Sequence, residues 1–378
     1  MGVLEQFAGL AASHTNSSIE SWKKQGGKVV GYLCSHVPVE ILHAAGILPV
    51  RLRAPGCTST TMADSYLSHL NCTYVRSCLE LILTGEYNFL DGIVFTNGCD
   101  HGRRLYDVIR EAHERPNLPF MHFFCVPRTT KSEAIAKWFS GEIENFRQSV
   151  EQAFDVSIPA IALKNAISVC NDTRGHLRYL YELRKLKAPP ITGAEALAVI
   201  VAAGSIPGDR YNHMLQDLFH ELEEREGAPG HGARLLVAGS GGCDNPEYFR
   251  IIEEQGGLIV TDSLCYGTRF FHKPVEAGEG DDPIDALAGA YLQRPSCAGM
   301  VDRVAERSDY VVSLAREYDA HGVVYQYIRY CDLWGGQLLH LRKRLKQENI
   351  PLLVLEREYA LGAVEQLKTR VQAFIECL

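Results

Sequence analysis

Two hydrophobic patterns alternate along the first third of the chain. Short apolar runs of strand length occupy residues 28–34, 90–96 and 118–126. Between them lie segments such as 103–114, in which apolar side chains recur at i, i+3, i+4 and i+7, the spacing of one helix face. Alternation of strands and helices predicts a parallel sheet that is covered by helices.

The rest of the chain first loses this alternation and then regains it. Residues 132–226 show almost only helical spacing, and a loop rich in glycine follows at 227–234. Strand and helix patterns then alternate again to the C-terminus. We therefore expect an α/β protein with two Rossmann-like (flavodoxin-like) parallel-sheet lobes and an intervening helical layer. The expected boundaries are 1–131 for the N-terminal α/β lobe, 132–230 for the helical segment and 231–378 for the C-terminal α/β lobe.

One sequence pattern occurs in both outer thirds. The segments "DGIVFTNGCD" and "HGVVYQYIRYCD" each indicate a strand that ends near a cysteine–aspartate pair, and each precedes a helix. Ligands of open parallel sheets bind beyond the carboxyl ends of the strands. A helix N-terminus at that place favours a thiolate. We expect Cys99 and Cys331 to meet in one crevice between the lobes; the alternative is two unrelated strand-end cysteines.

Composition narrows the class of protein. The 378 residues are 46% hydrophobic and 22% charged, as in ordinary globular domains. The formal net charge of -8 and the pI near 6.0 argue against a nucleic-acid-binding protein. No apolar run approaches the roughly 18 residues that span a bilayer, and "MGVLEQFAGL" lacks the pattern of a secretory signal. We therefore expect a cytoplasmic protein that binds neither nucleic acid nor membrane.

The twelve cysteines are the unusual feature of this composition. Disulfides are rare in a reducing cytoplasm, so metal binding or catalysis is favoured. No CxxC pair occurs, which excludes zinc ribbons and thioredoxin-type motifs, so metal-binding thiols would have to converge from distant segments. We expect Cys170 and Cys377 to be structural only. The candidates at strand ends or adjoining helices are Cys34, Cys72, Cys78, Cys99, Cys265, Cys297 and Cys331.

The glycine-rich "GSGG" before Cys243 is the one candidate phosphate loop. It follows an expected strand, but it fails both the GxGxxG and the P-loop patterns. A tight strand-to-helix turn is the favoured interpretation. The chain thus shows no ATP-hydrolysing motif of its own.

Four segments give the chain a resemblance to the benzoyl-CoA reductase/2-hydroxyacyl-CoA dehydratase family over nearly its whole length. They are "GYLCSHVPVEILHAAGILPVRL", "NCTYVRSCLELILTGEYNFLDGIVFTNGCDHGRRLYDV", "DSLCYGTRFF" and "YCDLWGGQLLHLRKRLKQENIPLLVLEREYALGAVEQLKTRVQAF". The resemblance implies two Rossmann-like lobes that hold a [4Fe-4S] cluster between them through three cysteines. Matched by motif, these are Cys72 before "YVRS", Cys99 before "DHGRR" and Cys331 before "DLWGG".

The same resemblance implies partners and a reaction. The partners are a homologous second subunit, in a hetero- or homodimer, and an ATP-dependent iron–sulfur activator protein, so that ATP acts only through the activator. The substrate is an acyl-CoA. One electron on the thioester carbonyl gives a ketyl radical anion, which expels a neighbouring hydroxyl in a dehydratase; in a reductase the electron enters a conjugated aromatic ring. Dehydratase subunits often have lysines where this chain has the arginines of "CDHGRR", and this difference slightly favours the reductase reaction.

Proton transfer in either reaction requires a nearby acid or base. His36, Glu40 and His101 are the candidate catalytic residues. For Glu40 the stronger explanation is a carboxylate in the first turn of a helix, near the positive end of its dipole. Of Arg103 and Arg104, which could pair with phosphate, we expect at least one to be solvated.

Two alternatives stay open. Cys34, Cys78, Cys265 and Cys297 exceed what one cubane requires, and some relatives carry an [8Fe-9S] double cubane, reduce small molecules and form homodimers. If these extra thiols line the crevice, that function is favoured over the acyl-CoA enzyme. The other alternative is a non-catalytic two-lobed scaffold or binding subunit with structural cysteines.

Overall fold

Two separate four-stranded sheets organise the chain, and all of their strands are parallel. The computed structural model describes residues 2–112, 118–227 and 232–378. The first sheet has the order β2-β1-β3-β4, with β1 (Val29–Tyr32), β2 (Leu48–Arg51), β3 (Gly92–Thr96) and β4 (Phe120–Phe124). The second has the order β6-β5-β7-β8, with β5 (Ala233–Gly239), β6 (Gly257–Ser263), β7 (Gly322–Ile328) and β8 (Leu352–Arg357). The predicted α/β class with two parallel-sheet lobes is confirmed, and the two sheets share one strand order.

Helices cover both faces of each sheet, which explains why the strands are continuous apolar runs. The side chains of Ile93, Val94 and Phe95 in β3, for example, are fully buried. Four helices accompany the first sheet: α2 (Ser17–Lys24), α3 (Val39–Ala44), α4 (Thr73–Leu83) and α5 (Asp100–Glu111). Four accompany the second: α10 (Pro246–Glu253), α12 (Val304–Glu317), α13 (Asp332–Gln347) and α14 (Val364–Ile375).

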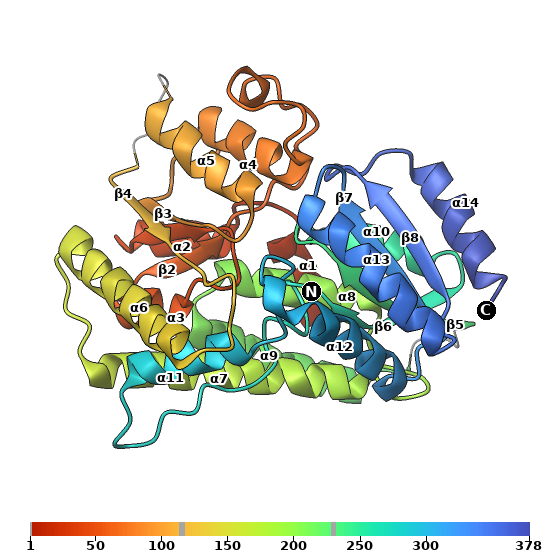
Figure 1. Cartoon of the computed structure of the whole chain (residues 1–378). Coiled ribbons are helices and arrows are strands. Elements are labelled where there is room, and N and C mark those ends of the chain that lie inside the picture. The colour runs from red at the N-terminus through yellow and green to blue at the C-terminus, as the bar shows by residue number, and fades with distance from the viewer. Residues whose placement is uncertain (1, 113–117, 228–231) are drawn as a thin grey trace.

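A helical layer joins the two lobes. It contains α6 (Glu133–Phe154), α7 (Ala160–Leu183), α8 (Gly193–Ala202) and α9 (Gly208–Glu223), together with α1 (Val3–Ala11) and α11 (Pro283–Gln293). Figure 1 shows α7 along the base of the molecule, beneath both lobes. Helix α1 packs on α8 and α9, and α11 packs on α6 and α7, so both outer parts of the chain contribute to this layer. The boundaries at 131 and 231 stay predictions.

Short connections complete the chain. Three are 3₁₀ turns: η1 (Ala63–Ser65), η2 (Ala203–Ser205) and η3 (Val301–Arg303). The "GSGG" segment lies between β5 and α10, and its Gly242 has a φ of 70°, which glycine adopts without strain. The predicted tight strand-to-helix turn is therefore confirmed. Arg357 at the end of β8 donates a hydrogen bond of 2.8 Å to the carbonyl of Gly242.

Buried polar contacts hold the carboxyl edges of the two sheets against each other. Arg53, just after β2, pairs with Asp244 at 3.2 Å, and both side chains are almost fully buried. The Tyr359 hydroxyl accepts from the backbone N–H of Ala54 and donates to Asp244 at 2.8 Å. The Arg53–Asp244 and Ala54–Tyr359 contacts join loops of the two lobes, and the Tyr359–Asp244 bond links the two residues of the second lobe that make them. The carboxyl edges of the two sheets therefore face each other.

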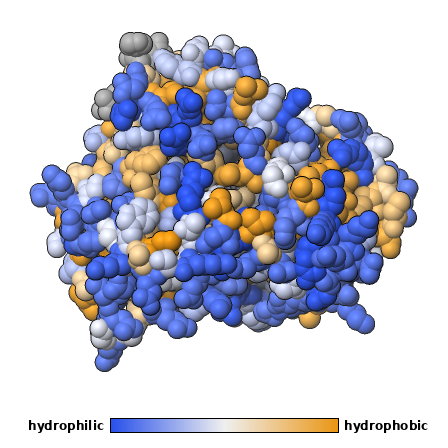
Figure 2. Space-filling model, in the orientation of Figure 1, coloured by the Kyte–Doolittle hydropathy of each residue, from blue (hydrophilic) through white to orange (hydrophobic). Residues whose placement is uncertain are grey.

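The outer surface is mostly polar. Figure 2 shows apolar residues near the middle of one face, where the two lobes approach each other, surrounded by hydrophilic ones. Within the described ranges, no helix combines the length and the apolar character that crossing a membrane requires.

Candidate functional site

Three cysteines from distant segments each occupy the N-cap position of a helix. Cys72, Cys99 and Cys331 are the N-cap residues of α4, α5 and α13. The predicted place of Cys99 and Cys331, at a strand end and directly before a helix, is confirmed. Helix N-termini carry unsatisfied N–H groups and a positive dipole end, both of which stabilise a thiolate. At Cys99 this is a direct contact, because the backbone N–H of Gly102 donates to Sγ at 3.3 Å. We call these residues the first thiol set.

The first thiol set gathers side chains from both lobes. Burial raises the pKa of Cys72, and the nearby thiols of Cys99 and Cys331 raise it further. Burial likewise raises the pKa of Cys331 to about 12, with a contribution from Cys99. The segments of Cys72 and Cys99 are in direct contact, because the backbone N–H of Cys72 donates to the ring of His101 at 3.1 Å. The role of the three thiols as cluster ligands stays a prediction.

Three further cysteines adjoin the first set. Cys34 follows β1, Cys265 follows β6, and Cys297 lies between α11 and η3. Burial raises the pKa of Cys34 to about 12, and Cys297 and Cys265 add to the shift. Cys297 also raises the pKa of both Cys99 and Cys331. We call Cys34, Cys265 and Cys297 the second thiol set, and Cys297 is its link to the first.

Backbone packing fixes this link. A Cβ atom on Gly299 would lie 2.6 Å from the carbonyl oxygen of Gly98, and a Cβ atom on Gly98 would lie 3.4 Å from Sγ of Cys34. The loop before Cys99 therefore touches both the loop after Cys297 and the Cys34 thiol. Cys34, Cys297 and the neighbouring His36 line a hollow of about 20 Å³, which has room for about one water molecule.

Buried arginines surround the second thiol set. Arg269 donates to Sγ of Cys265 at 3.0 Å, and Arg51 donates to the carbonyl of the same residue at 2.8 Å. Burial opposes ionisation of Cys265, but the charges of Arg269 and Arg51 outweigh it and lower the pKa of this thiol. Arg294 donates to the carbonyl of Ser35, and Arg307 donates to that of Cys297, both at 2.9 Å.

Among the described residues, the four guanidinium groups have no carboxylate partners, a property that they share with the buried Arg184 at the end of α7. Arg51, Arg269, Arg294 and Arg307 are each at most 7% exposed. In the described part of the chain none of them forms an ion pair with a carboxylate, whereas the equally buried Arg53 and Arg174 do. The Nε atoms of Arg51 and Arg269 also lack any hydrogen-bond partner there. Buried charges are normally paired, so this place in the fold is suited to an anionic group.

The three predicted proton-transfer residues lie in different surroundings. His36 is 7% exposed, and its Nδ1 lies 3.7 Å from Sγ of Cys34. Burial and the charges of Arg294, Arg269 and Arg51 lower the pKa of His36 to about 3, so its ring is neutral. The Nε2 atom is buried and has no hydrogen-bond partner among the described residues.

His101 and Glu40 have contacts within the fold. His101 accepts a hydrogen bond of 3.1 Å from the backbone N–H of Cys72 and so positions a residue of the first thiol set. Glu40 is completely buried in the first turn of α3, where it accepts from Arg174 of α7 and from the Tyr291 hydroxyl of α11. These bonds favour a structural role for Glu40, and the catalytic assignments of all three residues stay predictions.

The remaining candidates belong to neither thiol set. Cys78 is fully buried inside α4, the helix that Cys72 caps, and packs in the core of the first lobe; burial, followed by Asp244, Cys72 and Cys57, raises its pKa. Cys170 is buried in α7 and Cys377 is exposed near the C-terminus. The side chains of Arg103 and Arg104 lie on the exposed face of α5, which agrees with the solvated alternative. Sequence reasoning named all six thiols of the two sets but missed the arginines. The available signal was a charged residue inside an apolar or aromatic run, as in "PVRLR" and "GTRFF".

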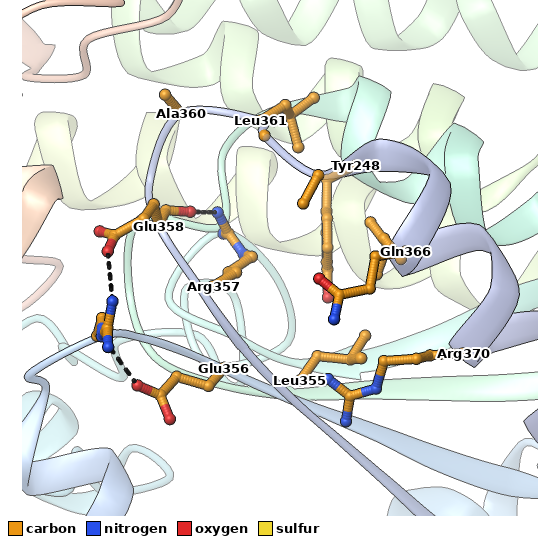
Figure 3. A pocket seen from close by; sticks show the side chains of 13 residues that line it. Tyr248, Leu355, Glu356, Arg357, Glu358, Ala360, Leu361, Gln366 and Arg370 are labelled. Atoms are coloured by element: carbon orange, nitrogen blue, oxygen red, sulfur yellow. Dashed lines mark hydrogen bonds and ion pairs between the residues drawn. The ribbon is translucent and has the colours of Figure 1, made fainter.

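A larger pocket of about 530 Å³ adjoins the first thiol set (Figure 3). It lies at the carboxyl end of β8 and is lined by Tyr248, Arg329, Leu355, Glu356, Arg357, Glu358, Ala360, Leu361, Gly362, Ala363, Gln366, Leu367 and Arg370. Its wall touches the thiol site, because Glu358 accepts a hydrogen bond of 2.8 Å from Thr73, the residue after Cys72. Arg329 in turn lies two residues before Cys331. Three arginines line this pocket, and one of them, Arg329, pairs there with Glu356 and Glu358.

The arrangement of the thiols distinguishes a site for an iron–sulfur cluster from a site for a single metal ion. Throughout the described ranges, no three His, Cys, Asp or Glu side chains are arranged to hold one metal ion. In a four-iron cluster each thiolate binds a different iron, so its ligands surround a volume instead of meeting at a point. Two sets of three converging thiols, with unpaired guanidinium groups beside them, fit such a group better than they fit one ion.

Comparison with known proteins identifies the family. The model for the family described as 2-hydroxyglutaryl-CoA dehydratase, D-component, matches residues 34–378. The chain belongs to this family. The match includes all six thiols of the two sets, and the expected kinship with benzoyl-CoA reductase and 2-hydroxyacyl-CoA dehydratase subunits is confirmed.

Three relatives illustrate its range. The chain is 25% identical to the (R)-phenyllactyl-CoA dehydratase beta subunit of Clostridium sporogenes, over 94% of the chain and 93% of that protein. It is 25% identical to the lactoyl-CoA dehydratase beta subunit of Anaerotignum propionicum, over 100% and 98%. It is 24% identical to a benzoyl-CoA reductase subunit of Thauera aromatica, over 96% and 94%. This family member is therefore an enzyme subunit of the dehydratase/reductase type, but these identities do not separate the two reactions.

Proposed function

We propose that this chain is the iron–sulfur subunit of an activator-dependent reductase that uses both thiol sets. The observation that supports the proposal is the placement of the cysteines: Cys72, Cys99 and Cys331 cap three helices, and the loop before Cys99 touches both the Cys34 thiol and the loop after Cys297. An [8Fe-9S] double cubane matches six thiolates, whereas one [4Fe-4S] cluster uses only the first set. When bound, such a group supplies single electrons at low potential.

The chain's own residues bind the group and control its surroundings. The helix N-termini hold the thiolates of the first set, and the arginines offset the charge of the second. Burial excludes bulk water from both. The neutral imidazole of His36 lies beside Cys34, and its buried Nε2, which has no partner among the described residues, could form a hydrogen bond to a small molecule bound there. A small substrate is part of the proposal.

The partners belong to the same proposal. The sequence has no P-loop, so ATP would act through a separate iron–sulfur activator protein that delivers one electron at a time. Two of the relatives are named as beta subunits, which implies assembly with another chain. We propose a second copy of this chain or a homologous subunit in that place.

A second candidate function is reduction of an acyl-CoA at a [4Fe-4S] cluster on Cys72, Cys99 and Cys331. The pocket of about 530 Å³ favours it, because arginines line the pocket and its wall contacts the residue after Cys72. The relatives whose names contain a CoA thioester support the same candidate function. In this alternative the second thiol set has no part in electron transfer.

A substrate assay with two variants separates the candidates. Reduced protein, supplied with activator and ATP, is offered acetylene as a small probe or a panel of CoA thioesters. We expect acetylene reduction, with loss in both Cys99→Ser and Cys265→Ser. Turnover of a CoA thioester that survives in Cys265→Ser would instead establish the second candidate. If neither substrate reacts and no iron is bound, the scaffold alternative stands.

A further inference from the structure

Four buried arginines border the second thiol set, and none of them forms an ion pair with a carboxylate of the described residues. Arg51, Arg269, Arg294 and Arg307 come from β2, the loop after β6, the end of α11 and α12. We call them the arginine belt. All four border the second thiol set, through Cys265, the carbonyl of Ser35 next to Cys34, and the carbonyl of Cys297.

Neutral contacts hold the arginine belt in place. The guanidinium of Arg51 lies 3.5 Å from the ring centre of Tyr266, and that of Arg294 lies 3.5 Å from the ring centre of Tyr291. Arg269 lies 4.6 Å from the ring centre of Trp334. Aromatic rings and carbonyls orient a buried cation, but they do not cancel its charge.

The buried carboxylates of this region have other partners: Asp244 pairs with Arg53, and Asp262 accepts from Tyr181 and from the backbone N–H groups of Leu264 and Thr268. Glu40 is fully buried close to Arg294, but Arg174 and Tyr291 already occupy its two oxygens. Among the described residues, the hydrogen-bond partners of the four guanidinium groups are backbone carbonyls, the Cys265 thiol, the Ser296 hydroxyl and the Gln337 amide oxygen, and none is a carboxylate.

We infer that the arginine belt is the counter-charge for an anionic occupant of the second thiol set, and that the chain without this occupant carries an uncompensated buried charge. The inference deepens the proposed function and rests on it for the identity of the occupant. An iron–sulfur core bound by three thiolates is anionic and becomes more so on reduction. Removing one positive charge should therefore have opposite effects on the iron-free and the iron-loaded protein.

The test compares chemical unfolding of iron-free and iron-loaded protein for Arg269→Met. Methionine keeps much of the packing volume on Trp334 but removes the charge. We expect a higher unfolding midpoint than wild type without iron and a lower midpoint with iron. We also expect iron to be lost to a chelator about tenfold faster or more, since ligand-supporting contacts have effects of this size. Arg269→Lys keeps the charge and should restore the wild-type order of stabilities.

A matched control is available in Arg53, which is as buried as the arginine belt but pairs with Asp244. Arg53→Met leaves a carboxylate unpaired, so it should lower the midpoint of both forms. If Arg269→Met also lowers both midpoints, or changes neither, the inference is wrong. Arg51→Met provides the same comparison should Arg269→Met fail to fold.

The two possible failures are distinguishable. A wild-type chain that never binds iron, combined with a raised iron-free midpoint in Arg269→Met, would refute the proposed function and leave the arginine belt as a site for a different anion. A chain that binds iron, but whose two forms respond to Arg269→Met in the same direction, would refute the charge argument alone.

Discussion

The two thiol sets have the same chemistry but opposite electrostatic surroundings. The first set lies at three helix N-termini, where backbone N–H groups supply the positive potential. The second lies in loops, and its positive potential comes from side chains, chiefly Arg51 and Arg269 at Cys265. Only in the second set is any thiol pKa lowered. Burial raises the pKa of all three thiols at the helix ends, whereas the charges of Arg269 and Arg51 lower that of Cys265.

This contrast has a consequence for loading and stability. A helix dipole costs the iron-free protein little, because its N–H groups are part of a helix that forms in any case. A buried guanidinium without a partner destabilises the iron-free protein until an anion arrives. We therefore expect the first thiol set to be required for iron binding. The stability of the structure around the second set should depend more strongly on whether iron is bound.

The largest expected effect comes from removing a first-set thiol. Cys99→Ser and Cys331→Ser should each lower electron-transfer activity by about a hundredfold or more, since even supporting contacts of metal ligands have effects up to about that size. Iron content and activity are measured together under anaerobic conditions. Cys377→Ser is the control, because this exposed thiol lies apart from both sets. Full activity in Cys99→Ser would show that the first thiol set is not part of the site.

The second set is tested by a pair of buried cysteines. Cys265→Ser should lose about half of the iron and leave the first set loaded. Cys78→Ala should keep all of the iron and lower the free energy of unfolding by about 1–2 kcal/mol, because Cys78 lies in an apolar core. Iron analysis and urea unfolding give both quantities. Equal iron content in Cys265→Ser and wild type would exclude the second set from the site.

The contact between the sets is tested at Gly299. A Cβ atom there would lie 2.6 Å from the carbonyl of Gly98, so Gly299→Ala should push the two loops apart and cost about 1–3 kcal/mol. Any magnetic coupling between the two iron groups in the electron paramagnetic resonance spectrum should weaken as well. Gly289→Ala in α11 meets nothing within 4 Å and should be neutral or stabilising by up to about 1 kcal/mol. Similar spectra and stabilities for the two variants would contradict the contact.

The last expected effect concerns acid sensitivity away from the thiols and leaves stability at neutral pH unchanged. Burial lowers the pKa of His122 from 6.5 to about 4, and no neighbouring charge contributes. A lowered folded-state pKa stabilises the neutral form, so its contribution is complete above pH 6.5 and is lost as the pH falls towards 4. The loss is at most about 3 kcal/mol. His122→Gln should flatten the pH dependence of unfolding in this range; an unchanged curve would assign the acid sensitivity to other groups.

Much of the fold could be predicted from the sequence because local patterns decide it. The apolar runs at β1, β3 and β7 and the helical spacing of α5 are visible without tertiary information. The strand-end position of Cys99 and Cys331 followed from these elements alone. Cys72 lacked such a strand and entered the first set through the family resemblance.

The second thiol set could not be assembled in the same way. Cys265 and Cys297 lie in loops without hydrophobic periodicity, so nothing local indicates that they meet Cys34. The buried position of the arginine belt was equally hidden, since charged side chains are expected on the surface. Cys78 shows the converse: it was grouped with the extra thiols, but its place on the inner face of α4 puts it in the core.

The central claim is that both thiol sets form one iron-binding site, and counting iron tests it most directly. Iron and acid-labile sulfide per chain are measured on protein purified without oxygen. The account predicts about eight iron atoms per chain, distributed over both sets. About four iron atoms, unchanged in Cys265→Ser and absent in Cys99→Ser, would contradict it and leave a single cluster on Cys72, Cys99 and Cys331.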